Sequence, residues 1–249
     1  SFFTQLRLAF SELVGLRGPD AVPIYWENAH KDHERGMDRT APDFFDDMYP
    51  VGPEHREVLQ ELLNTTAAAE GGDTALRLVR AVRVENSVLW GRYQAELARL
   101  RRKRGPCRFA GRGTPLTTEP LAEVPGCSGS SGFTQDLDDS VCEAYLWHGT
   151  KPQVAMQIAQ SGFAVGHKSR AGKRFGQGGY FSEDPAKADA YAGSGSGLYE
   201  GCYAMLLCRV VLGKQYHVRS FRQEDATDQA GSKFDSTLAE PRGASWREF

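Results

Sequence analysis

The sequence predicts a mixed domain of helices and strands, and three stretches carry this prediction. Residues 202–212 form the most apolar run in the chain, which is typical of a buried central strand. Residues 144–147 form a shorter apolar strand that leads into His148 and Gly149. Residues 86–100 carry apolar side chains at helical spacing, so they indicate a long helix with one face in the core.

Length and composition allow one large domain, or one domain with an extension. The chain has 249 residues, of which 40% are hydrophobic. Its formal net charge of −2 gives no overall attraction to nucleic acid or to a membrane surface. No apolar run reaches the roughly 20 residues that a helical membrane span needs. The chain shows no initiating Met and no signal-peptide pattern, so we expect an excerpt of a longer protein.

Cysteine usage indicates the compartment. The five cysteines are odd in number and scattered, without any C-x-x-C spacing. This pattern is typical of a reducing environment, so we expect an intracellular protein of the nucleus or the cytoplasm. It argues against a zinc finger, and no other metal ligands stand at usable spacing. The cysteines are Cys107, Cys127, Cys142, Cys202 and Cys208.

Residues 1–52 predict an N-terminal extension or linker. Apolar positions in residues 2–16 are compatible with an amphipathic helix, and residues 17–50 are acidic with scattered prolines. The aromatic residues of this stretch argue against full disorder. One interpretation is a linker that packs partly on the next domain, and the other is a partner-binding segment.

The following stretch predicts two helices and a strand. Helical spacing of apolar residues indicates a helix over 53–64, and residues 76–84 indicate a strand. Asn86 is placed to cap the long helix, whose last turn is basic. These charges suit the negative end of the helix dipole, so we prefer this interpretation to a nucleic-acid site. The basic residues are Arg99, Arg101, Arg102, Lys103 and Arg104.

Loops and short strands complete the chain. Residues 107–140 are rich in Gly, Pro, Ser and Thr and indicate a long surface loop or insertion. After the main apolar strand, Gly213 breaks the run and residues 215–218 continue it past a bulge. The polar and acidic residues 220–232 indicate another loop, and residues 234–238 re-enter the fold.

Two helices with clear start signals flank a glycine-rich turn. Thr150 is placed to cap the first helix, and Gly162 is placed to end it. Asp184, followed by proline, opens the second helix, which carries Tyr191. Residues 176–179 lack a third glycine at the spacing of a dinucleotide-binding loop, and no βαβ pattern surrounds them. Side chains at the ends of regular elements converge readily on a cleft.

Four short motifs follow one another in the second half of the chain. They are Leu-Trp-His-Gly-Thr at 146–150, a glycine-rich run ending in Tyr-Phe at 176–181, Lys-Ala-Asp-Ala-Tyr at 187–191 and Trp-Arg-Glu-Phe at 246–249. In this order they resemble the catalytic domain of the poly(ADP-ribose) polymerase family, the diphtheria-toxin-like ADP-ribosyltransferases. The resemblance covers roughly residues 53–249 and implies an α+β fold. In that fold two small, mostly antiparallel sheets surround an NAD cleft, with helices at the periphery.

The resemblance also implies a role for each motif residue. Glu248 matches the glutamate that holds the nicotinamide ribose and orients the acceptor, and His148 matches the histidine that bonds the adenosine ribose. Tyr180 and Tyr191 match the pair that flanks the nicotinamide ring. The implied catalytic residues are Glu248, His148 and Tyr180. The implied NAD-binding residues are His148, Gly149, Thr150, Tyr180, Phe181, Lys187, Ala188 and Tyr191.

These residue types suit cleavage of the nicotinamide–ribose bond of NAD+. Nicotinamide leaves as a neutral pyridine and needs no proton, so the difficulty is the oxocarbenium ion that develops on the ribose. A nearby carboxylate stabilises that charge, as in glycoside hydrolysis. The flat ring suits stacking on tyrosine, which adds about 0.5–1.5 kcal/mol per pair. NAD+ is then a co-substrate, and the chemistry needs no metal.

Two features depart from the family pattern. Ala188 stands where many members have a serine that bonds the carboxamide, so one hydrogen bond worth about 0.5–1.5 kcal/mol is missing. The chain ends at Phe249, whereas in the family the strand that begins here continues. We therefore expect a catalytic domain that is truncated at its C-terminal end, with Glu248 at a frayed terminus.

The leading hypothesis is transfer of ADP-ribose from NAD+ to protein acceptors with release of nicotinamide. Elongation to poly(ADP-ribose) stays open alongside transfer of single units. One alternative is an inactive module that binds NAD or ADP-ribose. Another is a scaffold in which residues 1–104 bind a partner. Neither a membrane nor nucleic acid is an expected partner of this stretch of chain.

Overall fold

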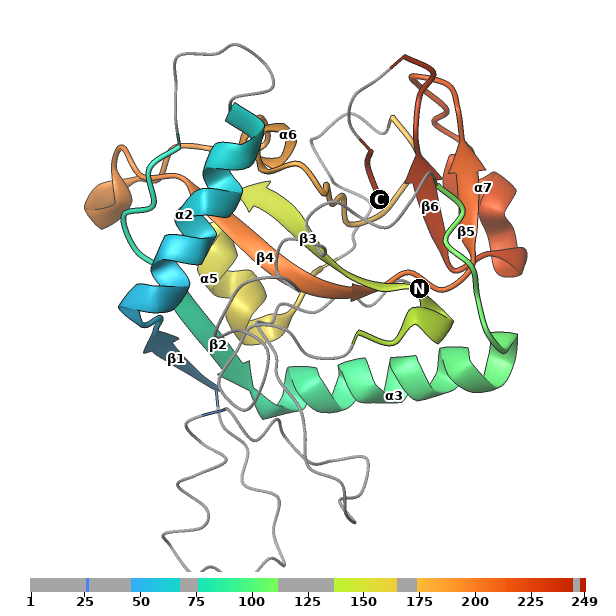
Figure 1. The fold of residues 1–249 in the computed structure, drawn as a ribbon, viewed down its shortest axis with the longest axis horizontal. Helices are drawn as coiled ribbons and strands as arrows, with labels where there is room; N and C mark the ends of the chain where they lie inside the picture. The colour runs from blue at the N-terminus through green and yellow to red at the C-terminus, as the bar shows by residue number, and fades with distance from the viewer. Residues whose placement is uncertain (1–25, 27–45, 68–75, 112–136, 165–173, 244–246) are drawn as a thin grey trace, which may run out of the picture.

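The computed structural model describes residue 26 and residues 46–67, 76–111, 137–164, 174–243 and 247–249 (Figure 1). Helices and strands mix as the α+β prediction requires. The expected helix at 2–16, the centre of the expected 107–140 loop and Cys127 lie outside the described residues.

Two strand pairs form the part of the sheet that carries the motifs. β3 (Glu143–Thr150) and β4 (Ala204–Val211) are antiparallel along their whole length. β5 (Gln215–Val218) and β6 (Ser236–Ala239) are parallel. The strands predicted over 144–147 and 202–212 are confirmed, with ends that shift by one or a few residues. Residues 215–218 also form a strand, but it pairs with β6 and does not continue β4 past a bulge.

Single bridges join these two pairs across the centre of the domain. Ser182 pairs with Trp147 of β3 and with Glu248, and Glu248 pairs in turn with Ala239 of β6. The order across the molecule is therefore β4, β3, Ser182, Glu248, β6, β5. Figure 1 shows β5, β6 and the short helix α7 (Ala226–Ala230) grouped on the right, with β3 and β4 in the middle. α7 lies within residues 220–232, which were expected to form only a loop.

The helix predicted over 53–64 is α2 (Pro53–Ala67), and it explains why the next strand is shorter than expected. Only β2 (Val82–Asn86) pairs, antiparallel to β1 (Asp46–Pro50). Gln60 of α2 instead holds the preceding stretch, because its amide donates to Leu76 O and its oxygen accepts from Leu78 N, both at 2.7 Å. A side chain thus takes the backbone groups that a strand partner would have used.

The long helix α3 (Ser87–Arg104) begins as predicted. The Asn86 side chain accepts a hydrogen bond from Leu89 N at 2.9 Å. Trp26, within the expected N-terminal extension, is fully buried, and its ring centroid lies 6.1 Å from that of Trp90 on α3. No helix among the described residues has the length and apolar character needed to span a membrane.

The basic end of α3 is engaged in ion pairs. Arg101 contacts Asp138 at 2.5 Å, and Arg104 contacts Asp235 at 2.9 Å. Lys103 lies 3.3 Å from the same Asp235 carboxylate. Burial alone would raise the pKa of Asp235, but the hydrogen bonds from Arg104, Lys214 N and Lys103, together with the charge of Arg104, outweigh it and the pKa lies below its usual value. These charges tie α3 to the rest of the domain, which agrees with the structural interpretation.

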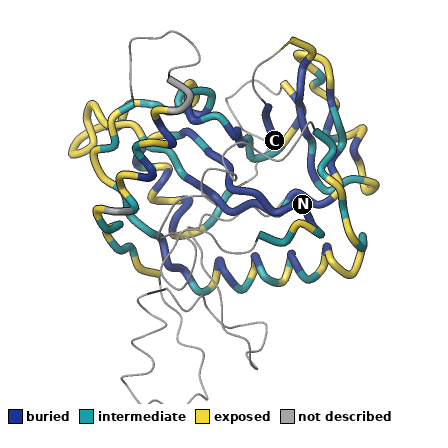
Figure 2. The backbone as a smooth tube through the Cα atoms, in the orientation of Figure 1, coloured by how far each residue is buried: buried dark blue, intermediate teal, exposed yellow. Residues whose placement is uncertain are grey.

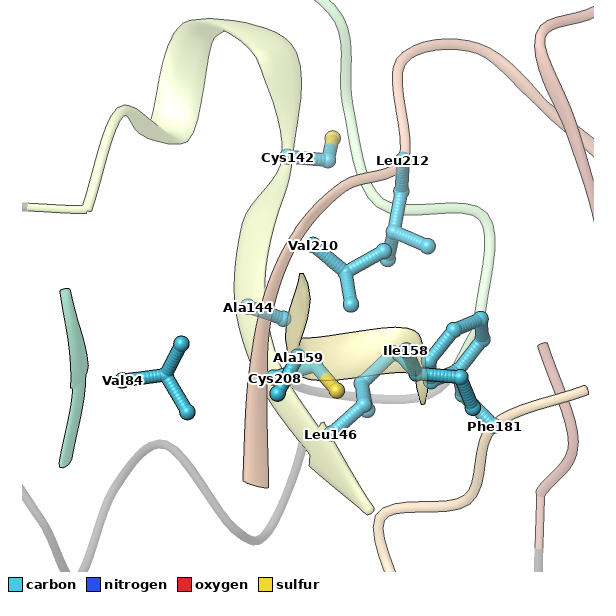
Figure 3. Packing of buried hydrophobic residues seen from close by; sticks show 10 residues of the cluster. All are labelled: Val84, Cys142, Ala144, Leu146, Ile158, Ala159, Phe181, Cys208, Val210 and Leu212. Atoms are coloured by element: carbon cyan, nitrogen blue, oxygen red, sulfur yellow. The ribbon is translucent and has the colours of Figure 1, made fainter. Parts of the chain in front are cut away.

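β3 is buried on both faces, and this fixes the position of the motif at its end. Its residues on one face join a cluster with α5 (Pro152–Ser161), while Tyr145 and Trp147 on the other face pack on α2. Figure 2 shows β3 as a nearly continuous buried segment. The cluster seen in Figure 3 consists of Val84, Cys142, Ala144, Leu146, Ile158, Ala159, Phe181, Cys208, Val210 and Leu212.

The helices that follow β3 begin differently from one another. Thr150 does not cap α5, because it is the last residue of β3 and pairs with Ala204. Gly162 does end α5, with φ of 83° and its N–H bonded to Ile158 O, as predicted. The cap of α6 (Pro185–Asp189) by Asp184 is also confirmed. α6 is short, so Tyr191 lies in the turn after it rather than on the helix.

Candidate active site

Glu248 lies at the junction of the split sheet. Its backbone exchanges hydrogen bonds with Ala239 at 2.8 and 3.0 Å, and Phe249 exchanges two with Phe181, both at 2.8 Å. The side chain of Glu248 is 2% exposed. The expectation of a frayed terminus is therefore wrong, because residues distant in sequence pair with this segment on both sides.

A buried ion pair anchors the residue before Glu248. Arg247 binds the two carboxylate oxygens of Glu183 through Nε and one terminal nitrogen, each at 2.6 Å. Both residues are buried, and Glu183 directly follows Ser182, which bridges to Glu248. The Ser182 hydroxyl also donates to Arg247 O at 3.1 Å. Sequence reasoning missed this pair, since neither residue belongs to a local pattern that would connect them.

The two carboxylate oxygens of Glu248 have different surroundings. Oε1 accepts the Tyr191 hydroxyl at 2.9 Å and lies 3.8 Å from Lys187 Nζ. Oε2 is buried and has no hydrogen-bond partner among the residues that the structure describes. A buried carboxylate oxygen without a partner is costly, so it marks a position where a ligand group is expected.

His148 is held in one orientation at the end of β3. Its Nδ1 lies 2.8 Å from Tyr180 O, and a carbonyl oxygen only accepts, so Nδ1 carries the proton. Burial lowers the pKa of His148, although the bond to Tyr180 opposes the shift, so the imidazole is neutral near pH 7. Nε2 is then an acceptor. Phe163 meets the ring edge-on at 5.0 Å, and Phe181 packs at 5.5 Å.

Gly149 has no room for a side chain. A Cβ at this position would lie 1.8 Å from the carbonyl oxygen of Ala188 and 3.0 Å from Ala192 N. Glycine at position 149 therefore lets the end of α6 and the turn that carries Tyr191 pack directly against β3. Ala188 itself is buried and offers a methyl group, without a hydroxyl, to this part of the site.

The hydroxyl groups of the two tyrosines have different partners. Tyr180 donates to Gly176 O at 2.7 Å and accepts from Phe175 N at 3.1 Å, so it stabilises the glycine-rich turn. Thr227 of α7 holds the same turn from outside. Tyr191 is 41% exposed and directs its hydroxyl to Glu248.

Most of these residues line one cavity of about 580 Å³. Ligand pockets usually measure roughly 300–1,000 Å³, so this cavity has room for a substantial part of a dinucleotide. Lys187 does not line it, but its Nζ lies 3.8 Å from Glu248 Oε1. The cavity is also lined by three residues that the sequence did not predict, because none belongs to the four motifs: Phe163, Val154 and Gln157. The one available signal was the position of Phe163 directly after Gly162, which ends α5. The lining residues that the sequence predicted are His148, Gly149, Thr150, Tyr180, Phe181, Ala188, Tyr191 and Glu248.

A second hollow of about 520 Å³ lies on the other side of the glycine-rich turn. It shares residues 178–181 and Glu248 with the first cavity. Residues 210–212 and Phe249 contribute to its apolar part. Within the described residues no group of three or more His, Cys, Asp or Glu side chains is arranged to hold a metal ion.

Comparison with known families supports the resemblance drawn from the motifs. A family model for the poly(ADP-ribose) polymerase catalytic domain matches residues 53–244. Comparison with curated proteins gives no match. The matched span contains the motifs around His148, Tyr180 and Tyr191, and Glu248 lies just beyond it. Proteins of this family use NAD+ as substrate for ADP-ribosyl transfer, and their catalytic domain has the ADP-ribosyltransferase fold. Since the match extends over most of the sequence, the chain belongs to the poly(ADP-ribose) polymerase catalytic-domain family.

Proposed function

We propose that this domain transfers ADP-ribose from NAD+ to a protein acceptor and releases nicotinamide. The observation that carries the proposal is the buried Glu248, which lines the same cavity as His148 and the two tyrosines. One of its oxygens is anchored, and the other has no partner within the described residues.

The reaction assigns each group a separate task. The bond between ribose C1′ and the nicotinamide nitrogen breaks, and its electron pair goes to the ring, which leaves uncharged. Glu248 lies close to the positive charge that develops on the ribose and stabilises it. His148 Nε2 accepts a hydrogen bond from a ribose hydroxyl at the adenosine end. An acceptor oxygen then bonds to C1′.

The acceptor determines whether a base is needed. A protein carboxylate arrives deprotonated, so its transfer releases no proton. A ribose hydroxyl on a growing chain must lose a proton, and Glu248 is the group that can take it. We propose that Glu248 therefore permits elongation in addition to the first attachment.

A labelled-substrate experiment tests the proposal. NAD+ labelled in the adenine half should transfer its label to protein, while free nicotinamide appears in equal amount. Glu248→Gln keeps the shape of the side chain but removes its charge, so we expect nicotinamide release to fall by about 10²–10³-fold. On a gel, a ladder indicates chains and a sharp band indicates single units. A folded parent protein that releases no nicotinamide would overturn the proposal.

The second candidate is an inactive module that binds NAD or ADP-ribose. Ala188 favours it, because the buried methyl group cannot bond the carboxamide. Calorimetry separates the two candidates. Binding of NAD+ without any release of nicotinamide supports the module, and turnover excludes it.

A further inference from the structure

Tyr191 needs only its ring to stack on a flat ligand, so its hydroxyl has a separate role. A phenylalanine would present the same face to a flat ligand, yet Tyr191 donates to Glu248 Oε1 at 2.9 Å. The other tyrosine of the cavity does not share this contact, since the Tyr180 hydroxyl is engaged by Gly176 and Phe175. The two tyrosines therefore differ in what their hydroxyl groups hold.

The hydroxyl that donates to Oε1 and the ammonium group that forms an ion pair with it come from one short segment. Lys187 lies four residues before Tyr191, and its Nζ is 3.8 Å from Oε1 and 5.6 Å from the Tyr191 ring centroid. The backbone of the turn is fixed, because Tyr191 N bonds to Ala188 O at 3.0 Å and Ala192 N bonds to Asp189 O at 2.8 Å. The Tyr191 hydroxyl thus approaches the carboxylate from a defined direction.

We infer that Tyr191 is a positioning residue whose hydroxyl fixes the Glu248 carboxylate so that Oε2 is the oxygen presented to the substrate ribose. The inference rests on the proposed function and assigns the roles of the two oxygens within it. Oε1 is anchored by groups of the protein, and Oε2 is buried without a partner among the described residues. A ribose hydroxyl that donates to Oε2 would satisfy an acceptor that the described residues leave without a partner.

The state of the phenol supports this role. Partial burial and the neighbouring Glu248 carboxylate raise the pKa of Tyr191 to about 12. The hydroxyl therefore stays protonated and remains a donor at any pH at which the enzyme would work. It holds the carboxylate without exchanging a proton with it.

The test separates the ring of Tyr191 from its hydroxyl. Tyr191→Phe keeps the ring, so the KM for NAD+ and the affinity for nicotinamide measured by calorimetry should change by less than about threefold. We expect kcat for nicotinamide release to fall by about 10–100-fold, because misplacement of a reacting group by about 1 Å can cost that much. Tyr203→Phe is the matched control, since Tyr203 is 61% exposed and lies outside the cavity. It should leave both constants unchanged.

The same substitution in a Glu248→Ala protein tests whether the Tyr191 hydroxyl acts through Glu248. In Glu248→Ala the hydroxyl has no carboxylate to orient, so adding Tyr191→Phe should change the residual nicotinamide release by less than about twofold. The same fall in both backgrounds, or a Tyr191→Phe protein with the kcat of the parent, would overturn the inference and leave the proposed function standing. A parent protein that releases no nicotinamide would overturn both.

Discussion

Replacing Arg247 with Met should destabilise the domain strongly, because it leaves a charge buried. Arg247 and Glu183 are 6% and 4% exposed, and two nitrogen–oxygen contacts of 2.6 Å join them. Methionine keeps most of the length of the side chain but cannot neutralise the carboxylate. The variant therefore isolates the loss of the ion pair from the loss of volume.

The magnitude follows from the burial of both partners. Breaking a buried pair by removing one member costs about 3–5 kcal/mol, since the remaining charge is desolvated. In a chain of this size each kcal/mol lowers the melting temperature by about 2–4 °C, so the expected fall is about 6–20 °C. The exposed pair Arg222–Glu224 is the matched control, with side chains 70% and 56% exposed. Arg222→Met should cost at most about 1 kcal/mol.

Urea unfolding measures these differences, and a double variant tests their cause. Glu183→Leu together with Arg247→Met removes both charges and keeps the volume apolar, so most of the lost stability should return. Nicotinamide release should return with it, because the segment before Glu248 is packed again. A single variant that loses less than about 1 kcal/mol, or a double variant as unstable as the single one, would refute the reasoning.

Two further outcomes are expected. Gly149→Ala should lower the free energy of unfolding by about 1–3 kcal/mol and abolish NAD+ binding, because its Cβ would overlap Ala188 O. The control is Gly91→Ala, which should not destabilise the domain because the space at Gly91 is open. Burial lowers the folded-state pKa of His148, so its contribution to the free energy of unfolding is complete above the unfolded pKa of 6.5 and is lost as the pH falls below that value. The urea midpoint should therefore decline less steeply from pH 7 to pH 5 in His148→Gln than in the parent protein.

Local chemistry predicted the parts of the fold that depend on neighbours in sequence. The Asn86 cap, the end of α5 at Gly162 and the start of α6 after Asp184 all follow from one side chain or one φ angle. Thr150 has the same local chemistry as a cap, yet pairing with Ala204 on β4 keeps it in the strand. A local preference worth about 1 kcal/mol was overridden by the sheet.

The site was predicted where a motif identifies a residue and missed where a contact spans the chain. The motifs identified the residues around His148 and Tyr191 but gave no sign of Phe163 packing on the His148 ring. They also gave no sign of the pair between Glu183 and Arg247, which are 64 residues apart. Residue types at fixed spacing carry chemistry, whereas the partners that orient them come from the topology.

The same distinction explains why Glu248 is ordered at the end of the chain. Chain ends fray when only local contacts hold them, but this segment lies between Phe181 on one side and Ala239 on the other. Ser182 carries the connection onward to Trp147, so one row of backbone bonds links the glutamate to the strand that carries His148. A shift of that row would move the carboxylate and the imidazole relative to each other. We therefore propose that the order of the split sheet is a condition for the proposed chemistry, and that the ion pair beside it holds that order.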